Sequence, residues 1–282
     1  MLKQRLITAA ILIPLVVWGI LKLPTPYLAA VLSLFVVQGA WEWGGLMQLN
    51  SRLGRGLFAL LVAVGMAMIW LFIDRATTDW LLLPIVSLFW WLLAIAWVLG
   101  YPQSTRRWAP RGVQAIVGLL VLLPTWLAVV GVHASGEQGP YLLLYVLILI
   151  WVADSGAYFG GRRWGKRKLA PAVSPGKTWE GVISALVLAA GYAMLAAYLF
   201  RMPGNLWPGF VVLSLVTVIF SVFGDLAESM FKRHAGVKDS GTLLPGHGGV
   251  LDRIDSVTAA TPVFVVGLWL ADGFGLFVGN GA

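Results

Sequence analysis

The chain has 282 residues, of which 59% are apolar and only 11% are charged. About a quarter of the residues in soluble domains are charged, so this composition excludes an ordinary soluble protein. The formal net charge is +8, and the chain contains no cysteine. Disulfides, cysteine nucleophiles and cysteine-ligated metals are therefore excluded.

Apolar segments of roughly membrane-crossing length recur along the whole chain. A helix needs about 20 consecutive apolar residues to cross a bilayer. Nine segments approach this length: Leu6–Leu21, Leu28–Leu49, Gly56–Ile73, Trp80–Leu99, Val113–Val132, Tyr141–Phe159, Glu180–Phe200, Pro208–Phe223 and Val257–Val278. We therefore predict an all-α polytopic membrane protein with about nine transmembrane helices. The eighth segment is short, and we expect its helix to continue past Asp225.

The first segment could be a cleaved signal peptide or a retained helix. Lys3 and Arg5 precede its apolar core, as they would in a signal peptide. It is followed by KLPTPY, without a clear small-x-small cleavage site, and then by another apolar segment. We therefore favour a retained first helix.

Basic residues are distributed unevenly between alternate connections. With nine crossings, 17 of the 20 Lys and Arg residues fall on the same side as the N-terminus. The other side carries only Lys22, Arg75 and Arg201. The positive-inside rule then places the N-terminus in the cytoplasm and the C-terminus outside. Because topology accounts for the basic excess, we expect no nucleic-acid partner.

The polar motifs lie in the second half of the chain. We divide the whole chain into an N-terminal region of five transmembrane helices (1–135) and a C-terminal catalytic region (136–282). Of the 12 acidic residues, seven lie between Asp154 and Asp255, at or near predicted cytoplasmic helix ends. Glu42 lies within a membrane segment of the first region. For Glu42 we favour a hydrogen bond to a neighbouring helix, or a position near the cytoplasmic surface, over a catalytic role.

The stretch from Ser229 to Asp255 carries nine ionisable side chains in 27 residues. Charge is costly in a membrane, so this density indicates a site for an ionic substrate. If the eighth helix continues, one of its faces carries Asp225, Glu228, Ser229 and Lys232. Asp252 and Asp255 lie one turn apart at the start of the ninth helix. Two helix ends can therefore direct carboxylates to one point, and carboxylate oxygens are ligands that Mg²⁺ prefers.

A glycine-rich loop, residues 245–249, connects these two helices. Glycines allow the backbone to approach a phosphate closely, which makes Gly248 and Gly249 candidate substrate contacts. His247 could be a metal ligand, an acid or a hydrogen-bond donor to phosphate. The alternative for the whole cluster is a solvated loop with salt bridges at helix ends.

A second group of polar residues runs from Asp154 to Glu180. Asp154 lies near the end of a long apolar segment, where a carboxylate needs a partner. We predict Ser174 as the N-cap of the seventh helix and Pro175 as its first residue. Lys177 and Glu180 would then lie on the opening turns, where a helix N-terminus beside a lysine readily binds an anion. Ordinary helix capping is the alternative.

Paired carboxylates and many basic groups suit chemistry on a nucleoside triphosphate. In nucleotidyl transfer, Mg²⁺ bridges phosphate oxygens and basic groups neutralise charge on the leaving pyrophosphate. A lipid phosphate as nucleophile is already anionic and needs no general base. This would account for the lack of a Ser-His-Asp arrangement.

These segments resemble one known family. The pattern S-x-F-K-R-x4-K-D-x-G-x2-L-P-x-H-G-G-V-x-D-R-I-D, at Ser229–Asp255, matches the motif of the phosphatidate cytidylyltransferases (CDP-diacylglycerol synthases) at every defined position. ADSGAYFGG at Ala153–Gly161 and KLAPAVSPGKTWEG at Lys168–Gly181 are also similar. MLKQRLITA at the N-terminus and AWEW around Glu42 are weaker matches, and the resemblance covers essentially the full length.

The resemblance implies transfer of the cytidylyl group of CTP to phosphatidate, with release of pyrophosphate. It implies a multi-pass, dimeric protein of the inner membrane, with Mg²⁺, a second cation such as K⁺, and a cytoplasmic active site. The implied catalytic residues are Asp225, Asp252, Lys232, Asp255 and His247, with Asp225 and Asp252 as metal ligands. The implied substrate-binding residues are Ser174, Lys177, Glu180, Asp154, Arg233, Lys238, Arg253, Gly248 and Gly249.

Two other functions compete with this interpretation. One is a CTP-dependent enzyme on another lipid, such as a polyprenol kinase-like or CDP-archaeol-forming relative, which would not be expected to carry the full motif. The other is a transporter, which would place ionisable groups at the bilayer midplane, often with repeat symmetry. Here the charges gather at one predicted membrane face, and no repeat is apparent.

Overall fold

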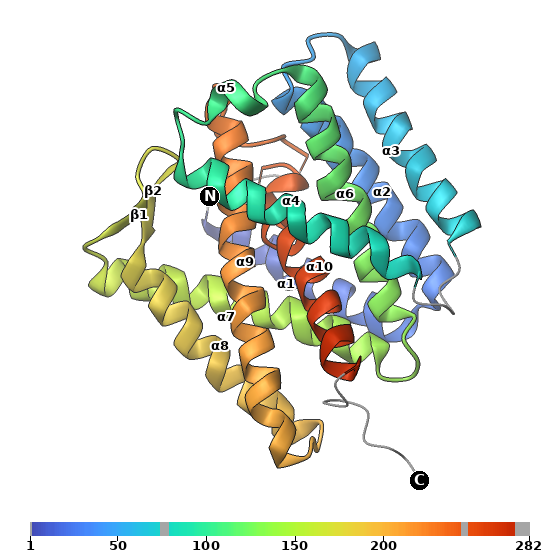
Figure 1. Cartoon of the computed structure of the whole chain (residues 1–282), viewed down its shortest axis with the longest axis vertical. Helices are drawn as coiled ribbons and strands as arrows, with labels where there is room; N and C mark the ends of the chain where they lie inside the picture. Colours follow the sequence, from blue (N-terminus) through green and yellow to red (C-terminus); the bar gives the residue numbers. More distant parts are fainter. Residues whose placement is uncertain (1, 74–78, 244–247, 274–282) are drawn as a thin grey trace.

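The structure, a computed structural model, describes residues 2–73, 79–243 and 248–273. Nine long helices dominate these residues, and a short helix and a small hairpin complete them (Figure 1). The helices are α1 (Leu2–Lys22), α2 (Thr25–Leu46), α3 (Arg52–Phe72), α4 (Leu82–Leu99), α5 (Thr105–Trp108), α6 (Arg111–His133), α7 (Gly139–Trp164), α8 (Trp179–Leu199), α9 (Trp207–His234) and α10 (Leu251–Gly273). Two strands, β1 (Lys168–Ala170) and β2 (Ser174–Thr178), pair antiparallel, and two 3₁₀ turns, η1 (Asp79–Leu81) and η2 (Gly204–Leu206), precede α4 and α9.

The described part of each predicted apolar segment lies mainly on one of the nine long helices. Seven of these, all except α1 and α2, are long and apolar enough to cross a membrane by length and composition. The chain therefore has the all-α polytopic membrane fold that its composition predicts. The count of nine crossings and the cytoplasmic N-terminus stay predictions. As expected, α9 continues past Asp225, to His234.

The predicted start of the seventh helix is wrong. Ser174 is not an N-cap, because Ser174–Thr178 forms strand β2 against β1. The helix begins at Trp179, and its N-cap is Thr178, whose hydroxyl accepts a hydrogen bond from the Gly181 N–H at 3.2 Å. Gly176 weakens any helical turn at this place, and the extended pairing satisfies the backbone groups instead.

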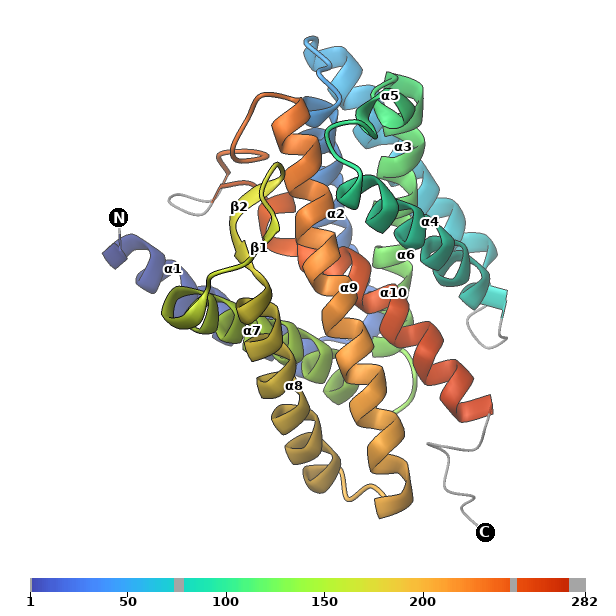
Figure 2. The ribbon, with the colours of Figure 1, turned by 60° about the vertical axis from the view of Figure 1, so that its left-hand side comes forward.

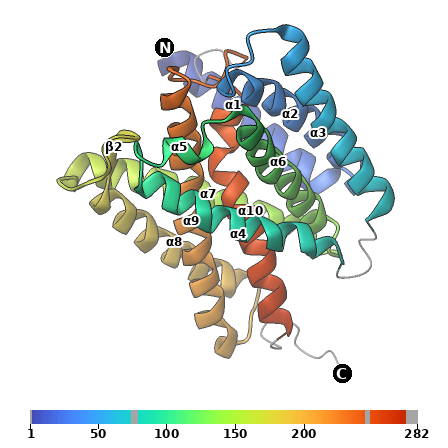
Figure 3. The ribbon, with the colours of Figure 1, turned by 45° about the horizontal axis from the view of Figure 1, so that its top comes forward.

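Apolar side chains cover much of the outer surface of the bundle. On α3, Leu53, Leu60 and Leu71 are 73%, 58% and 72% exposed. In Figures 1 and 3 this helix lies at the edge of the molecule, where it packs on α2 and α6. Such a surface is unusual for a soluble monomer and fits contact with lipid.

Small residues bring α7 and α8 close together. On α8, Ala185, Ala189 and Ala193 recur every four residues and are fully buried. On α7, a Cβ added at Gly156 would lie 3.1 Å from the backbone of Ala185. Small residues at such spacing let membrane helices approach closely and pack by van der Waals contact. In Figure 2 the two helices lie side by side, with the β1–β2 hairpin at the end where they are connected.

Small residues also bring α9 and α10 close together, beside the polar motifs. A Cβ at Gly224 would lie 2.5 Å from the backbone oxygen of Asp255 and 3.1 Å from the Ala259 side chain. The largest hydrophobic core includes Leu226 and Ala259 together with residues of α2, α4 and α6. The two predicted regions, 1–135 and 136–282, thus share one core, and their division by role stays a prediction.

Candidate active site

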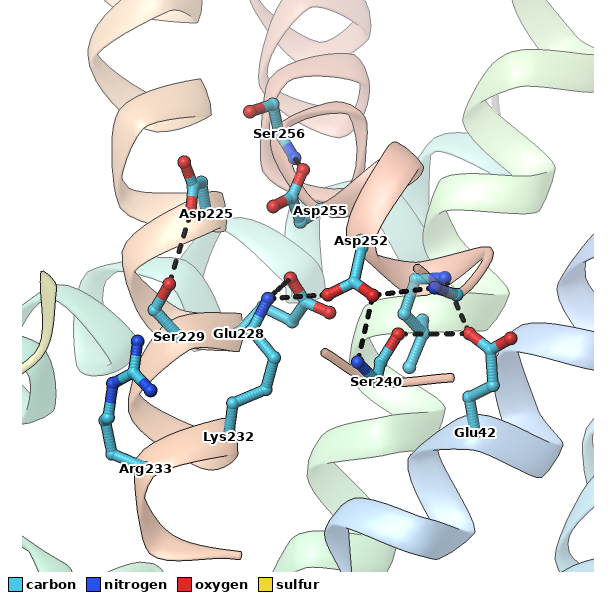
Figure 4. A network of polar contacts seen from close by, with 12 residues as sticks. Glu42, Asp225, Glu228, Ser229, Lys232, Arg233, Ser240, Asp252, Asp255 and Ser256 are labelled. Atoms are coloured by element: carbon cyan, nitrogen blue, oxygen red, sulfur yellow. Dashed lines mark hydrogen bonds and ion pairs between the residues drawn. The ribbon is translucent and has the colours of Figure 1, made fainter. Parts of the chain in front are cut away.

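The polar residues of the long motif meet where α9 ends and α10 begins. Figure 4 shows them between these two helices, with α2 on the other side of the connecting loop. The connections after α2, α4 and α9 all lie at this end of the bundle in Figures 1 and 2. The charged residues that are distant in sequence therefore converge at one end, as the sequence predicts.

Lys232 is the centre of this cluster. Its Nζ atom lies 2.9 Å from Glu228 Oε2 and 2.7 Å from Asp252 Oδ1. Glu228 precedes Lys232 by one helical turn on α9, whereas Asp252 comes from the first turn of α10. The Lys232 side chain is only 9% exposed, so both ion pairs are screened little by solvent. Lys232 thereby fixes α10 against α9.

The second oxygen of Asp252 binds the loop that precedes α10. Asp252 Oδ2 accepts hydrogen bonds from the backbone N–H of Ser240 at 2.9 Å and of Gly249 at 2.7 Å. Gly248 has a φ of +85°, and a Cβ there would lie 2.6 Å from the same oxygen. A glycine is therefore required at 248 for two reasons, the backbone conformation and the close approach of Asp252.

Glu42 lies on the far side of the same loop. It is buried, with 3% exposure, and accepts hydrogen bonds from the backbone N–H of Val250 at 3.0 Å and of Leu251 at 2.9 Å. The Ser240 hydroxyl donates to it at 3.1 Å, and so does the side-chain amide of Gln38 at 3.1 Å. The predicted hydrogen bond from Glu42 to a neighbouring helix is thus confirmed.

Asp225 lies more than one turn before Lys232 on α9 and pairs with the hairpin. Its Oδ2 atom is 2.7 Å from Lys177 Nζ, and its Oδ1 atom accepts a hydrogen bond from Ser229 Oγ at 3.3 Å. Lys177 also donates to the backbone oxygen of Val222 at 3.3 Å. The Asp225 side chain is 33% exposed, so it is the more accessible of the two predicted metal ligands. Strand β2, not a helix N-terminus, brings Lys177 here.

Two further carboxylates, Asp154 and Asp255, lie near Asp225. Asp154 on α7 is close enough to Asp225, Lys177 and Arg253 for their charges to interact. Asp255 is similarly close to Asp225 and Glu228. Tertiary packing therefore brings the second predicted group of residues to the first. The resulting site carries an excess of carboxylates around two buried or half-buried lysines.

The side chains of this site are of the kind that binds a hard divalent cation, but they are not arranged as a complete set of ligands. Carboxylate oxygens suit Mg²⁺, and Glu228 Oε1 is buried and receives no hydrogen bond in the described part of the chain. However, Asp225 and Asp252 are each paired with a lysine. Among the described residues, no three His or acidic side chains are grouped as a metal site. The cation would therefore need ligands from the substrate phosphates, as Mg²⁺ commonly has.

The remaining predicted residues lie around this centre. Arg233 donates from Nε to the backbone oxygen of Val173 at 3.1 Å, so it supports the hairpin. Lys238 and Arg253 are exposed, as a side chain that binds a substrate phosphate would be. Ser174, at the start of β2, is half-buried. His247 lies outside the described residues, so its predicted role stays a prediction.

Glu180 has a structural partner. It accepts hydrogen bonds from the backbone N–H groups of Lys166 at 3.0 Å and Arg167 at 3.1 Å. It therefore joins the start of α8 to the segment that leads from α7 into β1. Both carboxylate oxygens of Glu180 therefore accept hydrogen bonds from the protein backbone. Its role in substrate binding stays a prediction.

Sequence reasoning missed Ser240 as part of the site. Its N–H binds Asp252 and its hydroxyl binds Glu42, so it joins two carboxylates that are 210 positions apart in the chain. The only sequence signal was its place between Asp239 and Gly241 in the motif. The importance of Glu228 was visible as a member of one helix face, but its pairing with Lys232 required the structure.

Fold and site together define a polytopic membrane protein with an ionic site at its helix ends. The Cytidylyltransferase family matches the chain over residues 3–271. A phosphatidate cytidylyltransferase of Pseudomonas aeruginosa is 46% identical over 274 residues, which cover 96% of this chain and 98% of that protein. One of Haemophilus influenzae is 42% identical over 285 residues, with coverage of 94% and 97%. One of Staphylococcus haemolyticus is 45% identical over 134 residues, with coverage of 46% and 50%.

The chain belongs to the cytidylyltransferase family, as the motif at Ser229–Asp255 predicted. It is therefore a transferase of the membrane, and the competing transporter interpretation is not supported.

Proposed function

We propose that this chain transfers the cytidylyl group of CTP to phosphatidate and forms CDP-diacylglycerol and pyrophosphate. The observation that carries the proposal is the presence of two lysine–carboxylate ion pairs, Lys177–Asp225 and Lys232–Asp252, which both involve α9. Lys232 and Asp252 belong to the motif at Ser229–Asp255, and Lys177 belongs to the similar segment at Lys168–Gly181. The names of the two relatives that match nearly the whole chain support the same substrate pair.

In this reaction an oxygen of the lipid phosphate attacks the α-phosphorus of CTP. The bond from that phosphorus to the bridging oxygen breaks, and the electron pair leaves with pyrophosphate. No proton has to be removed from the nucleophile, so no general base is needed. The exposed cations Lys238 and Arg253 would hold phosphate oxygens, and Arg233 would steady the adjacent hairpin. Gly248 and Gly249 would let the backbone approach the nucleotide.

Mg²⁺ would be held by Asp225 and Asp252 together with phosphate oxygens. When bound, it would neutralise charge that develops on the transferred group and the leaving pyrophosphate. Because Lys177 and Lys232 contact these carboxylates in the structure, the lysines would orient them before substrate arrives. Asp255, Asp154 and Glu228 would supply carboxyl oxygens near a second cation such as K⁺.

The site is proposed to face the cytoplasm of a cell with this protein in its inner membrane. The 17 basic residues on one predicted side support this orientation. A cytoplasmic site would also give access to CTP. A homodimer, which the family resemblance implies, stays a prediction.

The first prediction tests the reaction itself. The purified protein in detergent is given phosphatidate and CTP labelled at the α-phosphate, with Mg²⁺ or with EDTA. We expect label in the lipid only with Mg²⁺. Because Asp252→Asn keeps the shape but loses charge, we expect it to reduce labelling by at least about 100-fold.

The matched control is Glu137→Gln, an equally small change at an exposed residue in the connection between α6 and α7. It should label lipid at the wild-type rate. Label arriving from γ-labelled CTP would indicate a kinase instead. Wild-type protein that labels a polyprenol or archaeal lipid phosphate but not phosphatidate would contradict the proposed acceptor.

A further inference from the structure

Glu42 is a buried acidic residue whose contacts the proposed chemistry does not use. It lies on α2, about 200 residues before the motif, yet both of its oxygens are directed at the loop that carries the motif into α10. Four hydrogen bonds reach it, and three of them come from this loop and the first residue of α10. A carboxylate that only filled space would not be expected to accept several hydrogen bonds from the same connection between α9 and α10.

Glu42 and Asp252 hold the same short stretch of backbone from opposite sides. Ser240 gives its N–H to Asp252 and its hydroxyl to Glu42. At the other end of the loop, the N–H of Gly249 binds Asp252, whereas the next N–H, of Val250, binds Glu42. Glu42 is therefore linked to Asp252 through Ser240 and through the backbone at residues 249–250, and Asp252 in turn contacts Lys232 (Figure 4).

Two glycines of the motif are fitted to this carboxylate. A Cβ at Gly241 would lie 2.6 Å from Glu42 Oε1, and a Cβ at Gly249 would also collide with Glu42. Glu42 also lies at the N-terminus of α10, where a negative charge is stabilised by the helix dipole and by unpaired N–H groups. Gly241 and Gly249 thus both fit closely against Glu42.

We infer that Glu42 is a positioning residue, which acts through Ser240 and through the backbone of residues 249–251 to fix Asp252 for catalysis. The inference rests on the proposed function for its kinetic test, but its structural test does not require turnover. Glu42 touches neither substrate in this scheme. Its effect should appear in kcat more than in the KM for either substrate, because a displaced Asp252 impairs the reacting geometry.

The experiment compares Glu42→Gln with wild type by steady-state kinetics and by hydrogen exchange. Glutamine has the size of glutamate, so a space-filling role predicts wild-type behaviour. A positioning role predicts that kcat falls by about 10- to 100-fold, because an amide N–H₂ now faces backbone N–H donors. The amides of Ser240, Gly249 and Leu251 should exchange at least about tenfold faster, while those of α8 keep their wild-type rates.

Two further variants sharpen the result. Ser240→Ala removes one hydrogen bond to Glu42 and keeps the N–H to Asp252, so a smaller fall in kcat is expected. Glu137→Gln repeats the charge change at an exposed site and should match wild type in both measurements. A Glu42→Gln protein with kcat within about twofold of wild type would overturn the inference. So would faster exchange spread evenly over the whole chain.

Failure of the proposed function would be recognised separately. In that case wild-type protein would not convert CTP and phosphatidate, whereas the exchange comparison would still report on Glu42. Unchanged protection of Ser240, Gly249 and Leu251 in Glu42→Gln would then overturn the positioning role.

Discussion

Lys232 is a buried basic residue whose charge is satisfied inside the protein. Its ammonium group contacts Glu228 and Asp252, and only 9% of the side chain is exposed. Lys238, six positions later, is exposed. The same residue type therefore has two uses in one motif. The buried lysine orients carboxylates, and the exposed lysine is available to a phosphate.

Replacing Lys232 by methionine should destabilise the protein. Methionine keeps much of the volume but leaves Glu228 and Asp252 as unpaired buried carboxylates. Removing one partner of a buried ion pair costs about 3 to 5 kcal/mol. We expect a loss of this size in the free energy of unfolding, measured by denaturation in detergent, together with loss of activity.

Lys238→Met provides the contrast. Because this side chain is exposed, stability should change by less than about 0.5 kcal/mol, while the KM for CTP or phosphatidate rises. Equal stability of the two variants would contradict the division of roles between these lysines.

At the scale of elements, the site depends on how closely α9 approaches α10. Gly224 is the position where α9 touches the backbone of α10, directly beside Asp225 and opposite Asp255. The helix pair therefore sets the distance between carboxylates that come from different elements. The β1–β2 hairpin has a comparable role, since β2 carries Lys177 to Asp225.

Gly224→Ala should impair both packing and activity. The added methyl group would lie 2.5 Å from the Asp255 backbone oxygen, so α10 must shift. Overpacking of this kind costs about 1 to 3 kcal/mol, and a displacement near 1 Å can reduce turnover by about 100-fold. Thermal unfolding and the cytidylyl-transfer assay would measure the two effects.

Gly191→Ala is the matched control. It lies within α8, and no neighbouring atom would come within 4 Å of the new Cβ. Alanine is the better helix former by about 1 kcal/mol, so stability should stay equal or rise slightly. If both variants lost the same stability, the close contact at Gly224 would not be the cause.

For the whole molecule, the main consequence of the fold is the gathering of charged connections at one end. The connections after α2, α4 and α9 share this end, whereas those after α6 and α8 lie toward the other (Figures 1 and 2). This alternation agrees with the uneven distribution of basic residues. Which end faces the cytoplasm follows from the positive-inside rule alone.

Cysteine labelling can test the orientation, because the chain has no native cysteine. Arg106→Cys and Glu137→Cys each place one thiol at an exposed position on opposite predicted sides. In right-side-out vesicles, a membrane-impermeant maleimide should label Glu137→Cys at once. Arg106→Cys should react only after the membrane is permeabilised. The reverse pattern would invert the topology, and labelling of both thiols from outside would contradict the alternation.

The sequence by itself determined the membrane class, the position of nearly every long helix and the segments whose charged residues gather at the helix ends. The length of an apolar segment and the cost of a charge within it are local properties, so they can be judged from the sequence without knowing the tertiary structure. The local pattern misled at Ser174–Thr178, because a Ser-Pro pair suits both a helix start and an extended strand.

Only the tertiary structure decided which charges are partners. Lys177 with Asp225, Lys232 with Asp252, and Glu42 with the start of α10 are contacts between separate elements. Helical spacing fixes neighbours within one element, such as Glu228 and Lys232, but not across elements. Those contacts depend on helix crossing and on close approach at Gly224 and Gly156, which the order of residues along the chain does not specify.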